Sequence, residues 1–367
     1  DLFDKVQGIV VGDKKGMPLG RLIAFEDKPK EYDCWNIDAD YENVSEVINN
    51  VQKMEIYKDD PFVLTIHIER KFRNSFISQN VIFYNDIGRI DFETDIDWHE
   101  HQVLLKAAFN LNIKADSINA EIQFGNVSRS LETKTSFDKA RFEMCAHRWV
   151  DMAGELLNEG IPFEQEKPKD DTRTINNNPE NKPVYGVSIL NDCKYGYDAK
   201  DNTIRLTLLK SGIYPNPCAD NGHHHFTYSI YSHKGDYRQG KVIEEAENLN
   251  RKLILVPACD SNAFINSNEP ENGFGIIDTG SEEGIFIDTV KKAEETDDII
   301  VRLYEGYGYE HNIKVSVPDA LLKAAGFKDV EISECDLREN VTDKKGINTL
   351  CIRPFEIVTL KLHFIKM

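Results

Sequence analysis

The sequence predicts an all-β protein, with a large antiparallel sandwich followed by a small one. Apolar and polar residues alternate with period two along most of the chain, and only two stretches have helical spacing. The 367 residues are too many for one ordinary core. We therefore expect two domains, a larger one over residues 1–268 and a small C-terminal β-sandwich over 269–367.

The strands of the larger domain are predicted from runs of β-branched or aromatic residues broken by Asn, Asp, Gly and Ser. The predicted strands cover 61–72, 80–86, 88–101, 103–113, 118–130, 140–152, 185–192 and 202–212. The segment "DAKDN" at 198–202 predicts a hairpin turn between the last two. Alternation along 140–152 would place Arg141, Glu143, His147 and Asp151 on one face.

Two helices are predicted, over 241–253 and over 318–327, the second with Pro318 in its first turn and Gly326 at its end. The Asn-, Pro- and charge-rich segment 154–183 is predicted to be an exposed insertion between two strands. A polar segment at 260–273 is predicted to link the domains.

The small domain is predicted to contain five strands and about 85 residues, a plausible domain size. Its strands are expected within 284–294, 298–308, 311–317, 329–337 and 353–364.

Charge and composition exclude several classes of partner. The chain has 44 basic and 63 acidic residues, a formal charge of −19, which would repel nucleic-acid phosphates and acidic membranes. It has no apolar run near the roughly 20 residues that span a bilayer. Seven scattered cysteines with no CxxC pair favour reduced thiols in a cytoplasmic protein. We expect neither nucleic acid nor membrane as a partner.

Histidines are concentrated in two places, "WHEH" at 98–101 and "GHHHF" at 222–226. In a strand, His99 and His101 would share a face, as would His223 and His225, with His224 on the other. A metal would require three or four ligands to converge, which needs these strands to be neighbours. The favoured interpretation is an imidazole and carboxylate cluster at a strand end with Trp98 in the core, and no metal site.

The segment "EYDCWNIDADY" at 31–41 combines aromatic residues with three aspartates. Aromatic faces beside carboxylates suit sugars, whose CH groups stack and whose hydroxyls donate hydrogen bonds. The alternative is a polar loop anchored by one buried Trp, and the segment by itself does not decide between them.

Several longer segments together resemble glycoside hydrolase family 38, the α-mannosidases, and most closely its cytosolic and bacterial branch. The segments are "IQFGNVSR" (122–129), "ARFEMCAHRWVD" (140–151), "YGVSILNDCKYGYD" (185–198), "RLTLLKSGIYPNPCADNGHHHFTYSIYSHKGDY" (205–237) and "VRLYEGYG" (301–308). The resemblance implies a supersandwich like that of galactose mutarotase, followed by the small β-sandwich.

The resemblance covers only the C-terminal β region of that family. The family's catalytic α/β domain, with its zinc ligands, nucleophile and acid/base residue, has no counterpart here. The resemblance therefore implies no catalytic residue in this chain, zinc bound in the missing N-terminal half, and retaining hydrolysis of α-mannosides or oligosaccharides by the whole enzyme. The isolated chain is predicted to be inactive, and a homo-oligomer is compatible with these features.

The resemblance also nominates substrate-binding residues. "KEYDCWNID" matches a family segment close to Y-D-A-W-D-I-D, so Tyr32, Asp33 and Trp35 are the candidates there. Lys210 stands where an Arg is common, and His224 matches a family His. Asn36 replaces a usual Asp, and His225 replaces a Glu, so the parent is a divergent member.

Two alternatives remain open at this point. The chain could be a free-standing carbohydrate-binding module without catalysis, or a mutarotase-like epimerase. The epimerase would require His147 or His224 to oppose a carboxylate across a pocket.

Overall fold

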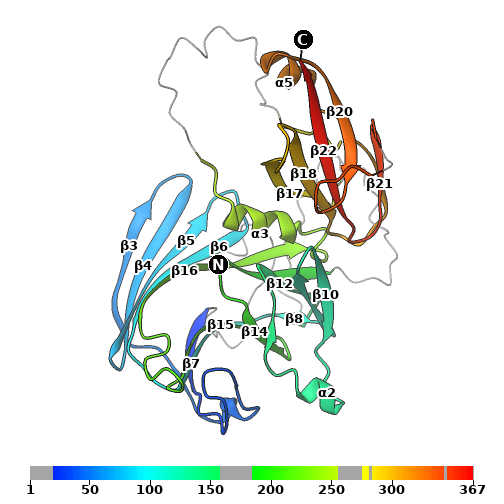
Figure 1. Ribbon diagram of the computed structural model, residues 1–367. Coiled ribbons are helices and arrows are strands. Elements are labelled where there is room, and N and C mark those ends of the chain that lie inside the picture. Colours follow the sequence, from blue (N-terminus) through cyan, green and yellow to red (C-terminus); the bar gives the residue numbers. More distant parts are fainter. Residues whose placement is uncertain (1–19, 158–183, 255–274, 281–282, 343–344, 367) are drawn as a thin grey trace. The chain divides into compact units, whose positions relative to one another are not determined.

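The computed structural model describes residues 20–157, 184–254, 275–280, 283–342 and 345–366 (Figure 1). They fall into two compact units. Unit 1 contains the residues up to 252 except 123–126, and unit 2 contains 123–126 and the residues from 253 onwards. The predicted linker at 260–273 lies outside the described residues, so the domain boundary at 268/269 stays a prediction.

Unit 1 consists of two antiparallel sheets, so the all-β prediction is confirmed. The first has six strands in spatial order: β11 (Met144–Cys145), β14 (Gly196–Lys200), β15 (Thr203–Ser211), β7 (Val103–Asn110), β1 (Arg21–Glu26) and β2 (Ser45–Val47).

The second sheet has ten strands, one of which, β8 (Ile113–Lys114), pairs with β12 beside the main order. That order is β10 (Gly125–Ser130), β9 (Ser117–Ile122), β12 (Trp149–Leu156), β13 (Tyr185–Asn191), β16 (Gly222–Lys234), β6 (Arg89–Trp98), β5 (Ser75–Tyr84), β4 (Val63–Phe72) and β3 (Val51–Asp59).

The main core lies between these two sheets. Alternate residues of β7, Leu105, Ala107 and Phe109, enter it from the six-stranded sheet, and Ile96 and Tyr228 enter it from the other. The period-two pattern is thus the direct result of one face of each sheet packing on the other. Figure 1 shows the large sheet curving alongside the smaller one.

The opposite face of the six-stranded sheet carries a buried charge network. Lys106, which is 0% exposed, donates to Glu143 and to Asp198 at 2.6 Å. Arg205 Nε donates to Asp198 at 2.7 Å, and the Tyr41 hydroxyl to the same carboxylate at 3.0 Å. Tyr41 belongs to the short helix η1 (Tyr41–Asn43), so the segment between β1 and β2 covers this face.

Two predicted strands are each divided in two. The segment 118–130 turns at Phe124, whose φ is 54°, between β9 and β10. The segment 140–152 contributes β11 to the six-stranded sheet and β12 to the ten-stranded one. A strand that changes sheets must leave its first ladder, so the predicted continuous alternation fails there.

The predicted polar face of 140–152 is therefore wrong. Glu143 joins the network around Lys106, whereas Asp151 is fully buried in the other sheet and accepts from Ser188 and His233. Arg148, which alternation would place on the face opposite to Asp151, pairs with Glu121 and Glu247.

The other local predictions of unit 1 are largely confirmed. The hairpin turn lies at Asp201, between β14 and β15. The predicted helix is α3 (Val242–Asn250), which buries Val242, Ile243, Ala246 and Leu249 and packs against β12 and β13. The insertion was predicted to begin at 154, but β12 continues to Leu156; residues 158–183 lie outside the described residues. A four-residue helix, α2 (Ser136–Lys139), was not predicted.

Unit 2 is a small β-sandwich, as predicted. Its four-stranded sheet has the order β17 (Ile285–Lys292), β18 (Ile299–Glu305), β22 (Ile357–Lys366) and β20 (Phe327–Cys335), and β19 (His311–Lys314) pairs with β21 (Thr349–Ile352). Strand β21 was missed because it is only four residues long. The predicted helix is α5 (Asp319–Ala324), with Pro318 at its N-cap and Gly326 at φ 75° beyond its end.

Candidate functional site

Two loops of unit 1 start side by side, because of the strand register. The last residue of β1, Glu26, and the last of β15, Ser211, both pair with Val103 of β7. The loop 27–44 follows β1, and the loop 212–221 follows β15. Figure 1 shows both at the same end of the sheets.

Aromatic side chains project from these loops into solvent. Tyr32 has a left-handed backbone (φ 59°), and its carbonyl accepts hydrogen bonds from the N–H groups of Trp35 and Asn36, both at 2.8 Å. This tight turn leaves Tyr32 and Trp35 each 69% exposed, and Tyr214 on the other loop is 68% exposed. Both loops thus present large aromatic side chains to solvent.

Asp33 fastens the two loops together. Its Oδ2 accepts from the backbone N–H groups of Ile213 and Tyr214, the latter at 3.0 Å. Burial raises the pKa of Asp33, but these backbone hydrogen bonds and Lys210 outweigh it, so the pKa is lowered overall. In addition, the N–H of Cys34 donates to the Tyr214 carbonyl at 3.2 Å. The aromatic side chains are therefore held on a cross-linked frame.

Lys210 is the second fastening. It extends from β15, where its Nζ donates to the Asp33 carbonyl at 2.7 Å and to the Asp27 carboxylate. A lysine forms point contacts of this kind readily. The structure thus brings Tyr32, Asp33, Trp35 and Lys210 together, two facing solvent and two engaged inside the loops.

Trp98 supports the frame from below. It is fully buried against Phe72, with ring centroids 5.8 Å apart, and its Nε1 donates to Ser211 Oγ at 3.1 Å. The prediction of Trp98 in the core is confirmed. The role of Ser211 was not predicted, since nothing in a single Ser at a strand end signals a partner 113 residues away.

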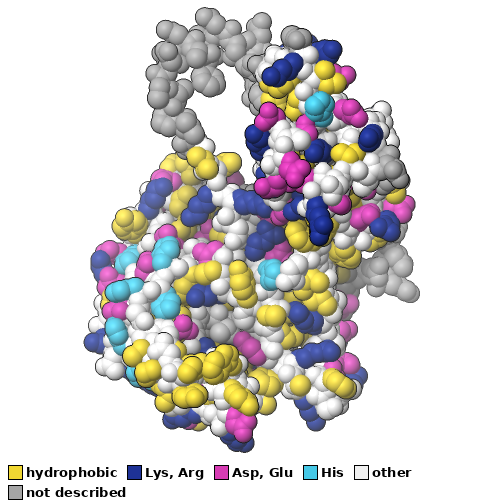
Figure 2. Space-filling model, in the orientation of Figure 1, with side chains coloured by type: hydrophobic (Ala, Val, Ile, Leu, Met, Phe, Trp, Pro, Cys, Tyr) yellow, Lys and Arg dark blue, Asp and Glu magenta, His cyan; other side chains and the backbone are white. Residues whose placement is uncertain are grey.

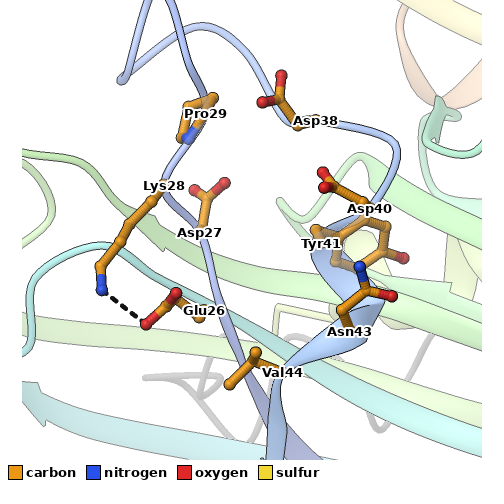
Figure 3. A pocket seen from close by; sticks show the side chains of 9 residues that line it. All are labelled: Glu26, Asp27, Lys28, Pro29, Asp38, Asp40, Tyr41, Asn43 and Val44. Atoms are coloured by element: carbon orange, nitrogen blue, oxygen red, sulfur yellow. Dashed lines mark hydrogen bonds and ion pairs between the residues drawn. The ribbon is translucent and has the colours of Figure 1, made fainter.

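A pocket opens within the loop 27–44 (Figure 3). Its volume is about 220 Å³. The lining residues are Glu26, Asp27, Lys28, Pro29, Asp38, Asp40, Tyr41, Asn43 and Val44. The aspartates at 38 and 40 were among the carboxylates noted in the sequence, whereas Asp27 was missed because it lies between Glu26 and Lys28 in a charged segment that does not signal burial.

The histidines form a separate ladder on the ten-stranded sheet. In the pairing of β16 with β6, His223 lies opposite Asp97 and His225 opposite Asp95. His225 Nδ1 lies 2.8 Å from Asp95 Oδ1, and His99 Nε2 lies 2.9 Å from Asp97 Oδ1. Figure 2 shows histidine and acidic side chains intermingled over β4 to β6 and β16. The predicted imidazole and carboxylate cluster is confirmed, although His99 follows the end of β6 instead of lying in it.

His224 reaches the end of the loop 212–221, but no described hydrogen bond joins it to Tyr32, Asp33, Trp35 or Lys210. Its Nε2 lies 2.8 Å from the carbonyl oxygen of Asp220, and it lines a shallow pocket of about 500 Å³ with the histidine ladder. Among the residues that the structure describes, no three His, Cys, Asp or Glu side chains are grouped closely enough to hold a metal ion. The described residues therefore do not fit a zinc ion. Nor does any helix in the described ranges have the length and hydropathy to cross a membrane.

His147, the other histidine that an epimerase would need, lies beside Tyr195, with ring centroids 5.6 Å apart. It lines neither the pocket within the loop 27–44 nor the one at the histidine ladder.

The chain is similar to known proteins over nearly its whole length. Residues 6–160 and 163–218 match the profile of the glycosyl hydrolases family 38 C-terminal domain, and residues 284–360 match that of the family 38 C-terminal beta sandwich domain. The chain is 30% identical to alpha-mannosidase G of Dictyostelium discoideum and 27% identical to human alpha-mannosidase 2C1, over 98% and 95% of its length. It spans only 30% of each of these relatives.

Solved structures show the same fold. An alpha-mannosidase from Enterococcus faecalis V583 superposes on 95% of this chain and 40% of its own, with a TM-score of 0.61 at 14% identity. The sequence profiles and the fold therefore indicate the same family. The chain belongs to glycoside hydrolase family 38, and it corresponds to the C-terminal β domains of that family's α-mannosidases.

Proposed function

We propose that this chain is the C-terminal β portion of a cytoplasmic, zinc-dependent α-mannosidase that hydrolyses α-mannosides with retention in mannose metabolism. The catalytic groups and the zinc ligands would be supplied by an N-terminal domain outside this chain. This chain would contribute carbohydrate binding.

The carbohydrate role is supported by the hydrogen bonds that hold the loops 27–44 and 212–221 together. Tyr32 and Trp35 are exposed on a segment that Asp33 and Lys210 hold in one conformation. Exposed aromatic rings that are already ordered lose little conformational entropy on stacking against a sugar. We propose that Tyr32 and Trp35 contact the mannoside directly. Asp33 and Lys210 would position them, and His224 would contact the substrate from the start of β16.

The test is hydrolysis of an aryl α-mannoside by the full-length gene product. We expect Trp35→Ala to lower kcat/KM by about tenfold, or roughly 1.4 kcal/mol of transition-state stabilisation. Tyr57→Ala is the matched control, because Tyr57 is 70% exposed on β3, the edge strand of the other sheet. Equal activity of both variants would contradict the role of Trp35.

Two further outcomes bear on the function itself. The isolated 367-residue chain should not hydrolyse the aryl mannoside, and saturable turnover by it would overturn the proposed division of labour. A full-length gene product that binds mannosides without hydrolysing them would favour the free-standing binding module instead.

A further inference from the structure

The pocket within the loop 27–44 contains a carboxylate oxygen that lacks a donor. Asp27 is 1% exposed and lines the base of the pocket. One of its oxygens, Oδ2, accepts from Lys210, whereas Oδ1 is buried and has no hydrogen-bond partner among the described residues. Buried polar atoms are rarely left so, since the group has given up its hydrogen bonds to water. Figure 3 shows the Asp27 carboxylate directed between the strand and the loop that carries Asp38 and Asp40.

The mouth of the pocket offers further unengaged acceptors. The side chains of Asp40 and Asn43 are exposed and form no hydrogen bond or ion pair with other described residues. Asp38 is half-buried and oriented by its neighbours, since it accepts from the Lys30 N–H at 3.0 Å and from Asn36 Nδ2 at 3.2 Å. Acceptors thus stand at the base and around the rim of one cavity.

The remaining lining is mixed, with an ion pair of Lys28 and Glu26 at 2.6 Å beside three apolar or aromatic residues. Pro29, Val44 and the ring of Tyr41 line the same pocket, and the Tyr41 hydroxyl points away from it to Asp198. An apolar wall with a few convergent polar groups is the general character of small-molecule sites. The combination of a ring face with several acceptors suits a ligand that has CH groups on one side and hydroxyls at its edge.

A cation is the competing occupant, and two observations disfavour it. No three acidic side chains are close enough to surround one metal ion in the described parts of the chain, although hard cations need six to eight oxygens in direct contact. The negative charge of the pocket is also partly neutralised, because Lys210 pairs with Asp27 and Lys28 pairs with Glu26 at 2.6 Å. What Asp27 Oδ1 lacks is a hydrogen-bond donor.

From this geometry we infer that the pocket binds one pyranose unit of a mannoside through its hydroxyl groups, one donating to Asp27 at the base and others to Asp40 and Asn43 at the rim. The identity of the sugar rests on the proposed function, whereas the site itself rests on the cavity and its unengaged acceptors. Burial raises the pKa of Asp27, an effect that Lys210 only partly offsets, as expected for a carboxylate short of donors.

The test is to titrate the 367-residue chain with α-1,2-, α-1,3- and α-1,6-mannobiose and to measure binding by calorimetry and by NMR. We expect Asp40→Ala with Asn43→Ala to weaken binding at least tenfold. Both side chains are exposed and without described partners, so the fold should be unaffected. Asp59→Ala, an exposed carboxylate at the end of β3 that also has no described partner, is the matched control and should bind as the wild-type chain does.

A second variant probes the base. Asp27→Asn retains the shape of the side chain and an acceptor for Lys210, and should also weaken binding, with chain integrity checked by its thermal transition. Trp35→Ala separates this inference from the proposed function. If Trp35→Ala weakens binding while the Asp27 and Asp40 variants do not, the pocket is not the subsite, although the mannoside contact stands.

Two other outcomes would overturn the inference. One is the absence of binding by the wild-type chain at any mannobiose concentration tested, whatever the activity of the full-length protein. The other is stabilisation of the chain by calcium chloride that disappears in the Asp40→Ala variant, which would identify the pocket as a cation site.

Discussion

Tyr41 belongs to two clusters of carboxylates that differ in how their charges are met. On one side its hydroxyl joins Lys106, Glu143, Asp198 and Arg205, where every acid has a basic partner and Lys106 and Asp198 are almost fully buried. On the other side its ring lines the pocket of Asp27, Asp38 and Asp40, where one buried oxygen and two rim side chains have none among the described residues. Paired burial fastens a loop to a sheet, whereas unpaired acceptors beside a cavity are available for a ligand.

The largest effect should come from breaking the paired cluster. Lys106→Met would leave Glu143 and Asp198 buried beside each other without their shared cation, and burial already raises the pKa of Glu143 despite Lys106. We expect a loss of about 3–5 kcal/mol in the free energy of unfolding. Urea denaturation of the chain measures it. Lys200→Met is the control and should change stability little, because Lys200 forms an exposed pair with Glu42. An equally small loss in Lys106→Met would contradict the structural role of the buried charge network.

Removing the Tyr41 hydroxyl should weaken the paired cluster and leave the pocket unchanged. Tyr41→Phe deletes the donor to Asp198 but keeps the ring that lines the pocket. We expect a loss of about 1–2 kcal/mol in stability, with mannobiose affinity unchanged. The same denaturation and titration measure both, with Tyr57→Phe as the exposed control. A variant with wild-type stability and weakened binding would reverse the assignment of hydroxyl and ring.

The fastening by Asp33 should depend on pH. Because its pKa in the folded chain is lowered, its contribution to stability is present above its unfolded value of about 3.9 and is lost as the pH falls through the folded value. Asp33→Asn should therefore cost about 1 kcal/mol near neutral pH, and the difference from the wild-type chain should shrink in acid. Thermal unfolding between neutral pH and strong acid measures it. A difference that is constant with pH would show that charge plays no part in holding the loops.

The smallest effect is expected on the open side. Asp40→Ala removes an exposed carboxylate without a described partner, so stability should change by less than about 0.5 kcal/mol. A stabilisation would fit relief of repulsion from Asp38. A large loss would mean that Asp40 has a structural role, and would blur the contrast between the two clusters.

Much of the fold follows from local pattern. The alternation along 61–72 and 202–212 predicted β4 and β15 because one face of each sheet is buried. It failed at 140–152, where the chain passes from one sheet to the other, since a change of partner is not recorded in the alternation itself. The buried charge of Lys106 was not predicted, for a related reason. A lysine inside "VLLKAAF" signals a buried charge only when Glu143, 37 residues away, is known to cover it.

The sequence by itself determined the all-β class, the small C-terminal sandwich, the family and the aromatic character of the segment 31–41. These depend on residue types and on spacings within short windows. Only the tertiary structure decided that Asp33 and Lys210 fasten loops, that His223 and His225 face Asp97 and Asp95, and that Asp27 lines a pocket. Those relations join residues far apart in the chain. The pairing of β1, β7 and β15 brings the loop residues within hydrogen-bond distance, and the pairing of β16 with β6 does so for the histidines.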